Sequence, residues 1–194
     1  MGRLTQAVLR CRWGGAIFGL LTMLAMGVTT SGAQTLGSRE YQIKAAFLYN
    51  FVKFIEWPPE AFPSTNAAIN LCILGEDPFG DDLEQTMQDK IINGRAMVVQ
   101  RLKAVQSLQG CHVLFVSASE QKRVTQILES LKGQSVLTVS EMERFAAIGG
   151  MINFTLQENK VRFEINVDVT ERAGLKVSSK LLKLATIIRD GDRN

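Results

Sequence analysis

Histidine, cysteine and proline are scarce in this chain, which has one histidine, three cysteines and four prolines among its 194 residues. The histidine, His112, directly follows Cys111, and neighbouring side chains on a strand point to opposite faces. A zinc site that uses both residues is therefore disfavoured. A hydrolytic triad would need His112 as its base, and the chain lacks the Gly-x-Ser-x-Gly motif that exposes a nucleophilic serine. We expect no enzyme activity, no catalytic residue, no metal and no cofactor.

An excess of charge of one sign is also missing from most of the chain. The formal net charge is +3, from 22 basic and 19 acidic residues. Three of the basic residues are Arg3, Arg10 and Arg12, so the chain beyond them has 19 basic and 19 acidic residues and is neutral. Non-specific nucleic-acid binding needs a basic surface that neutralises phosphates. We therefore expect no nucleic-acid partner.

Long apolar runs are confined to the N-terminus. Residues 1–12 contain the three arginines and no acid, residues 13–28 are mostly apolar, and the small residues Ser31 and Ala33 precede Gln34. This pattern is typical of a secretory signal that is cleaved before Gln34. An uncleaved membrane anchor is the alternative, but an apolar run of about 16 residues is shorter than the roughly 20 that span a bilayer. We predict a signal peptide at residues 1–33 and a single domain at residues 34–194.

Residues 39–57 carry the strongest periodic pattern in the chain. Phe47, Phe51 and Phe54 recur at helical spacing, and a second apolar stripe lies beside them, which leaves only a narrow polar edge. Pro58 and Pro59 then end the pattern, because proline cannot donate to the helical hydrogen-bond ladder. Pro58 also pushes Trp57 out of the helical region, so we predict a helix of roughly 17 residues from Arg39 that is covered on most sides.

Short apolar runs and helical patterns alternate in the rest of the chain. Strands are predicted at residues 69–74, 95–102, 112–116, 135–139, 151–155 and 161–165, and helices at 81–87, 119–131, 141–147 and 178–188. Such alternation indicates parallel pairing, and the last two strands, separated by a short polar turn, indicate a hairpin. The predicted fold is a three-layer α/β domain, with a mostly parallel sheet flanked by helices and a C-terminal antiparallel hairpin.

The order of these elements resembles that of a response-regulator receiver. Receivers hold magnesium with acids after the first strand, where this chain has Glu76 and Asp77. They also need a phosphorylatable aspartate at the end of the third strand, and here Val116 is followed by Ser117. We therefore expect no phosphotransfer site, and we interpret Asp77 as the start of a helix.

Two cysteines remain beyond the predicted signal peptide. Cys72 and Cys111 each lie at a strand-like run, so two adjacent strands could bring them together. An even pair in an exported chain predicts a disulfide, and a closed loop of about 40 residues would stabilise the fold by roughly 3–4 kcal/mol. Two buried free thiols are the alternative.

Several segments of the chain resemble the YfiR family of bacterial periplasmic proteins, which restrain membrane-bound diguanylate cyclases. The segments are KAAFLYNFVKFIEWP at 44–58, LCILG at 71–75, VRFEIN at 161–166 and AGLKVSSKLL at 173–182. The resemblance implies a periplasmic homodimer that binds the periplasmic portion of an inner-membrane diguanylate cyclase, lowering cyclic di-GMP and biofilm formation. It also favours the Cys72–Cys111 bridge. The second cysteine pair of some members is missing here, since residues 145–153 contain no cysteine.

The polar residues near the C-terminus are candidates for a contact surface. Apolar residues at 161, 163 and 165 alternate with polar ones, and a serine pair precedes the last predicted helix. We hypothesise a partner- or ligand-binding surface that is bordered by Glu164, Asn166, Lys176 and Ser178, with Glu56 and Trp57 nearby. A solvated strand face and an ordinary helix cap are the alternative reading of these residues.

A second function is compatible with the same sequence. Open α/β sheets usually bind ligands in the crevice at the carboxyl ends of their strands. The chain would then be a periplasmic sensor module that binds a small ligand and acts on a hybrid sensor kinase.

Overall fold

A computed structural model describes residues 32–104 and 108–190, and the side chains among them from residue 37 onward. The predicted signal peptide at 1–33 lies outside the described residues, apart from Gly32 and Ala33. These two residues begin helix α1 (Gly32–Phe54). Within the described residues, no helix is long and apolar enough to cross a membrane.

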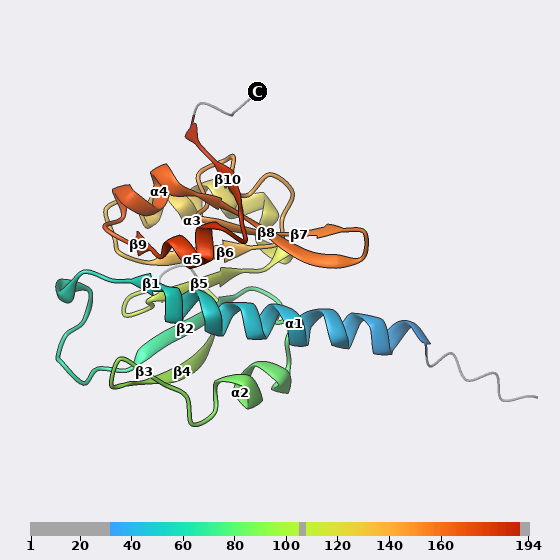
Figure 1. Cartoon of the computed structure of the whole chain (residues 1–194), viewed down its shortest axis with the longest axis horizontal. Coiled ribbons are helices and arrows are strands. Elements are labelled where there is room, and N and C mark those ends of the chain that lie inside the picture. Colours follow the sequence, from blue (N-terminus) through green and yellow to red (C-terminus); the bar gives the residue numbers. More distant parts are fainter. Residues whose placement is uncertain (1–31, 105–107, 191–194) are drawn as a thin grey trace, which may run out of the picture. The chain divides into compact units, whose positions relative to one another are not determined.

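Helix α1 lies along one face of a central sheet (Figure 1). Leu48 and Phe51 are fully buried, as the predicted apolar stripe requires. The Phe51 ring packs on Phe163 at a centroid distance of 5.0 Å and on Phe154 at 5.6 Å. Both of these partners belong to the C-terminal hairpin, so the N-terminal helix is fixed to strands more than a hundred residues later in the chain.

The helix ends at Phe54, within about one residue of the end predicted by a helix of roughly 17 residues from Arg39. Strand β1 (Ile55–Glu56) follows and pairs in antiparallel register with strand β9 (Lys176–Val177). The backbone N–H of Ser178 also donates to the carbonyl of Phe54 at 2.9 Å. Pro58 disfavours helical backbone just before it, and β9 supplies the hydrogen bonds that the helix would have made.

The central sheet has eight strands in the order β10-β8-β7-β6-β5-β2-β4-β3 (Figure 1). Strands β4, β2, β5, β6 and β7 are mutually parallel, and β7 and β8 form the antiparallel hairpin. The predicted fold class is confirmed. The strands are β2 (Ile69–Leu74), β3 (Ile91–Ile92), β4 (Arg95–Leu102), β5 (Val113–Val116), β6 (Leu137–Ser140), β7 (Ile152–Gln157), β8 (Lys160–Asn166) and β10 (Thr186–Ile188).

The sheet separates two buried clusters. Val113 and Phe115 of β5 pack in the cluster with α1 and α2 (Asp81–Met87), whereas Leu114 and Val116 pack in the cluster with α3 (Val124–Ser130). Successive residues of one strand therefore serve opposite faces, as the two-residue period of a strand requires. The disulfide between Cys72 and Cys111 lies in the α3 cluster and confirms the predicted pairing.

Two predicted helices have other structures. Residues 143–149 form consecutive turns in place of the helix predicted at 141–147, and Arg144 adopts φ of 60°, which interrupts any helical ladder. The helix predicted from residue 119 starts as the 3-10 helix η3 (Ala118–Arg123) and becomes α-helical only at Val124. A further short 3-10 helix, η1 (Pro59–Ala61), follows β1.

The C-terminal helix predicted at 178–188 is also wrong beyond its first turn. Helix α5 (Ser179–Leu182) is short, and Thr186–Ile188 forms β10, which pairs in parallel with β8. Threonine and isoleucine favour strands, and β8 offered an unpaired edge. Helix α4 (Val167–Arg172), which we did not predict, starts at Asn166, whose side-chain oxygen accepts a hydrogen bond from the N–H of Val169.

Candidate functional site

Four of the six predicted contact residues lie together at the C-terminal end of α1. We call them the β1–β9 surface: Glu56, Trp57, Lys176 and Ser178. Glu56 and Lys176 are directly paired residues on the two antiparallel strands, and both side chains are exposed. Opposite charges at paired, exposed positions attract each other only weakly, so both side chains remain accessible to another molecule.

Ser178 and Trp57 are tied into the fold. The Ser178 hydroxyl accepts a hydrogen bond from the N–H of Lys180 at 3.3 Å and so caps α5. The Trp57 indole N–H donates to the carbonyl of His112 at 3.3 Å, and the side chain is half-buried. A half-buried tryptophan beside exposed charges is typical of the anchors found in protein interfaces.

His112 is buried next to Trp57 and is held by contacts inside the fold. Its Nδ1 accepts a hydrogen bond from the N–H of Asn70 at 3.1 Å, and its ring stacks on Phe62 at a centroid distance of 4.5 Å. Burial lowers the pKa of His112 below its ordinary value, and the positive charge of Arg95 lowers it further. The neutral ring is therefore favoured, as its acceptor role requires.

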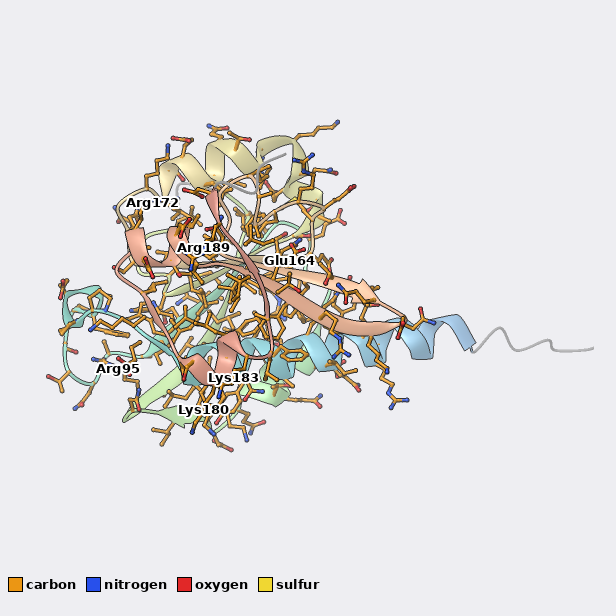
Figure 2. All side chains as sticks on the ribbon, turned by 45° about the horizontal axis from the view of Figure 1, so that its top comes forward. Arg95, Glu164, Arg172, Lys180, Lys183 and Arg189 are labelled. Carbon is orange, nitrogen blue, oxygen red and sulfur yellow. A yellow bond between two sulfur atoms is a disulfide. The ribbon has the colours of Figure 1, made fainter. Side chains whose placement is uncertain are left out.

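The other two predicted residues, Glu164 and Asn166, contact different elements. Asn166 is buried, and its side-chain N–H group donates to the carbonyl of Ala146 at 2.9 Å while its oxygen caps α4. Glu164 accepts a hydrogen bond from the side chain of Asn153 at 3.3 Å. Figure 2 shows Glu164 on the hairpin, apart from Lys180 and Lys183 near α5. The structure does not bring these two residues to the β1–β9 surface.

The acidic loop after β2 is stabilised by an arginine. The Asp77 carboxylate accepts from the N–H of Phe79 at 2.8 Å and from Nε of Arg101 at 2.7 Å. Arg101 also forms an ion pair with Glu84 of α2. Among the described residues, no group of three or more His, Cys, Asp or Glu side chains is arranged to hold a metal ion.

A charged pocket lies at one end of the sheet, and apart from Glu164 its residues were not predicted from the sequence. Lys44 of α1 is 3% exposed, and its ammonium group forms ion pairs with Glu40 and, at 2.5 Å, with Glu141. The hydroxyl of Tyr41 donates to Glu141 at 3.1 Å. The Tyr41 ring also lies beneath the Lys44 ammonium, 4.7 Å from ring centroid to nitrogen. Burial, followed by the negative charge of Glu141, raises the pKa of Tyr41 above its ordinary value.

These residues line a pocket of about 690 Å³, which we call the strand-end pocket. Ala118 comes just after β5, and Glu141 directly follows β6, so the pocket lies at the carboxyl ends of parallel strands. Crevices at this end of an α/β sheet are the usual ligand sites. The polar and charged residues of its lining are Glu40, Tyr41, Lys44, Glu141, Glu143, Arg144, Asn153, Thr155 and Glu164.

The sequence contains only a partial signal for this pocket. Glu40, Tyr41 and Lys44 stand at spacings that place them on one side of a helix. Glu141 lies 97 residues after Lys44, and no local pattern connects the two. Glu164 is the one predicted residue that lines the pocket, although its prediction rested on the alternation of β8.

A comparison with protein-family models matches residues 41–186 to the family described as YfiR/HmsC-like. The match runs from Tyr41 in α1 to Thr186 in β10, well over half of the 194 residues. It includes the β1–β9 surface and the strand-end pocket except for Glu40 and Ile188. This protein belongs to the YfiR/HmsC-like family.

Proposed function

We propose that the protein is a periplasmic regulator without enzymatic activity that binds the periplasmic portion of an inner-membrane diguanylate cyclase. Binding would favour the inactive state of the cyclase and so lower cyclic di-GMP and biofilm formation. The observation that carries the proposal is the family match over residues 41–186, since YfiR family members restrain such cyclases. The Cys72–Cys111 disulfide fits an oxidising compartment.

The proposal includes an exported single domain. The signal peptide at residues 1–33 would be removed, and residues 34–194 would act as one domain and as a homodimer. Mass spectrometry of the protein recovered from the periplasm should give an N-terminus at Gln34. Light scattering on the purified protein should give twice the mass of the chain.

The β1–β9 surface is our proposed partner surface. It combines exposed charges at Glu56 and Lys176 with the half-buried Trp57. The partner would need only a few kcal/mol of difference in affinity between the active and inactive cyclase states to shift the equilibrium. Glu164 and Asn166 remain proposed contributors, Asn166 by shaping the end of β8 from inside the fold.

Exchanging the charges of one pair tests this surface. The double variant Glu56→Lys with Lys176→Glu keeps an opposite pair on β1 and β9, so the local fold should persist. We expect it to bind the periplasmic portion of the cyclase at least tenfold more weakly, measured by calorimetry with the purified partner. Lys122→Glu on η3 is the matched control and should bind like the unaltered protein.

The cellular experiment decides the direction of the effect. Deleting the gene in its own bacterium should raise cyclic di-GMP, and restoring the unaltered protein should lower it again. The charge-exchanged variant should not lower it, whereas Lys122→Glu should. Unchanged cyclic di-GMP after deletion would contradict the proposed regulation of a cyclase.

The strand-end pocket favours a second candidate function. A small-ligand sensor that acts on a hybrid sensor kinase would use a pocket at the strand ends, and this pocket has the size for a small ligand. Membranes of the same bacterium, incubated with the oxidised and the reduced protein, should yield a cyclase or a sensor kinase by affinity capture. The captured cyclase or kinase is then purified and tested for direct binding. Binding of a cyclase supports the first candidate function, and binding of a sensor kinase supports the second.

A further inference from the structure

The strand-end pocket has more negative than positive charge. Four carboxylates line it, from Glu40, Glu141, Glu143 and Glu164, against two cations, from Lys44 and Arg144. Lys44 is buried between two of these carboxylates, so those three groups together already have one uncompensated negative charge. Lys44 is thus engaged within the protein and is poorly placed to attract an anionic ligand.

Two hydrogen-bonding atoms on β7 have no partner among the described residues. Asn153 is 2% exposed, and its side-chain N–H group donates to Glu164. An ionised carboxylate only accepts hydrogen bonds, so this contact fixes the amide with its nitrogen toward Glu164. The amide oxygen, Oδ1, then accepts no hydrogen bond, and the hydroxyl of Thr155 is also unpartnered.

Both unpartnered atoms belong to residues that line the pocket. Asn153 and Thr155 are two positions apart on β7, so their side chains lie on the same face of the sheet. Buried polar atoms in folded proteins almost always have a partner, and each exception requires an explanation, such as a bound water, ion or ligand. A ligand with N–H groups could satisfy both atoms, because the Asn153 oxygen accepts hydrogen bonds and the Thr155 hydroxyl can also accept one.

We propose that the strand-end pocket binds a small organic cation, an ammonium or guanidinium compound. Its N–H groups would donate to Oδ1 of Asn153 and to the Thr155 hydroxyl, and its charge would be offset by the excess carboxylates. The pocket volume of about 690 Å³ suits an organic molecule, whereas the described residues offer no cluster of ligands for a metal ion.

The proposal goes beyond regulation of a cyclase and does not depend on it. Binding of the cation is measured on the protein alone, so a failure here leaves the partner experiment untouched. Equally, loss of the cyclase interaction would not remove the pocket. A cation that also altered partner binding would connect the two sites.

Titration calorimetry with putrescine, a linear diamine, is the test. Neutral 1,4-butanediol, of the same length and with hydroxyls in place of ammonium groups, is the matched probe. We expect one putrescine per chain at 0.15 M salt and no measurable heat from the diol. Absence of putrescine binding, or equal binding of the diol, would overturn the proposal.

Variants then locate the site. Thr155→Val keeps the side-chain shape and removes the hydroxyl, and Glu143→Gln removes one exposed carboxylate of the lining. Each should weaken putrescine binding by roughly fivefold or more. Thr125→Val on α3 and Glu171→Gln on α4 make the same chemical changes outside the pocket and should leave the affinity within about twofold. Equal weakening by all four variants, or weakening by none, would show that putrescine does not bind in this pocket and would overturn the proposal.

Discussion

Lys44 is the clearest case of a buried charge in the described structure. Its two carboxylate partners, Glu40 and Glu141, come from α1 and from the turn after β6, so the ion pairs join the helix to the sheet. Removing one member of a buried pair usually costs more than the pair contributes, because the remaining charge is left without compensation. The arrangement therefore makes each of these three residues sensitive to replacement.

We expect Lys44→Met to lower the free energy of unfolding by about 2 kcal/mol, because Glu40 and Glu141 are then left facing each other in a partly buried site. The value is smaller than for a fully buried pair, since the side chains of Glu40 and Glu141 are 27% and 17% exposed. Urea unfolding at pH 7 measures the effect. Adding Glu141→Gln to Lys44→Met should restore part of the loss, and a fully stable single variant would show that the ion pairs do not contribute.

His112 makes stability depend on pH in a defined direction. The fold lowers the pKa of His112 below its ordinary value of 6.5, mainly by burial, so the unfolded chain takes up a proton more readily than the folded one. Its contribution to stability is complete above pH 6.5 and is lost as the pH falls from 6.5 through the lower pKa of the folded state.

Because His112 is the only histidine, its replacement isolates the effect. Urea unfolding of the unaltered protein should show stability falling between pH 7 and pH 5.5. In His112→Asn, which keeps a side-chain acceptor for the Asn70 N–H, the fall should be smaller, whatever the variant's stability at pH 7. Parallel pH profiles for the two proteins would disprove a role for His112.

At the scale of single elements, the two helix caps differ in how much they contribute to the stability of the fold. Asn166 is buried and uses both ends of its amide, one for the cap of α4 and one for the carbonyl of Ala146. Ser178 caps the four-residue α5 and is partly exposed. Burial decides how much each cap contributes to stability, because a buried group that loses its partner cannot form a hydrogen bond to water instead.

We expect Asn166→Ala to lower the free energy of unfolding by about 2 kcal/mol, from the lost cap and the unpaired carbonyl of Ala146. Ser178→Ala should cost about 1 kcal/mol or less. Both are measured by urea unfolding. If Asn166→Ala were no less stable than Ser178→Ala, the buried amide would have no special weight in this fold.

The elements that the sequence predicts best are those whose pattern is local. The strand at 69–74 and the helix at 81–87 were predicted with the bounds that the structure has. The elements predicted worst depend on distant partners: Ile55–Glu56 becomes a strand because β9 lies beside it, and Thr186–Ile188 because β8 does. The same holds for the strand-end pocket, whose Lys44 and Glu141 meet only through the fold.

At the scale of the whole molecule, the disulfide joins the centre of the sheet. Cys72 lies in β2, and Cys111 lies two residues before the start of β5. Strands β2 and β5 are neighbours in the middle of the sheet. The two cysteines are 39 residues apart, so the bond restricts a long loop in the unfolded chain.

We expect reduction of Cys72–Cys111 to lower the free energy of unfolding by roughly 3–4 kcal/mol. Urea unfolding with and without a reducing agent measures the difference. The variant with both cysteines changed to alanine serves as the control, since a reducing agent should have no further effect on it. Equal stability of the oxidised and reduced forms would contradict the expected role of the bond.

Two features of β8 oppose the pairing of its outer edge with a strand of another molecule. Strand β10 pairs with Glu164, Ile165 and Asn166, so it covers only the second half of β8. The first half contains Lys160 and Arg162, whose exposed charges oppose the addition of a foreign strand. Addition of a foreign strand at this half of β8 is therefore disfavoured, and replacing both charges with neutral residues should increase aggregation.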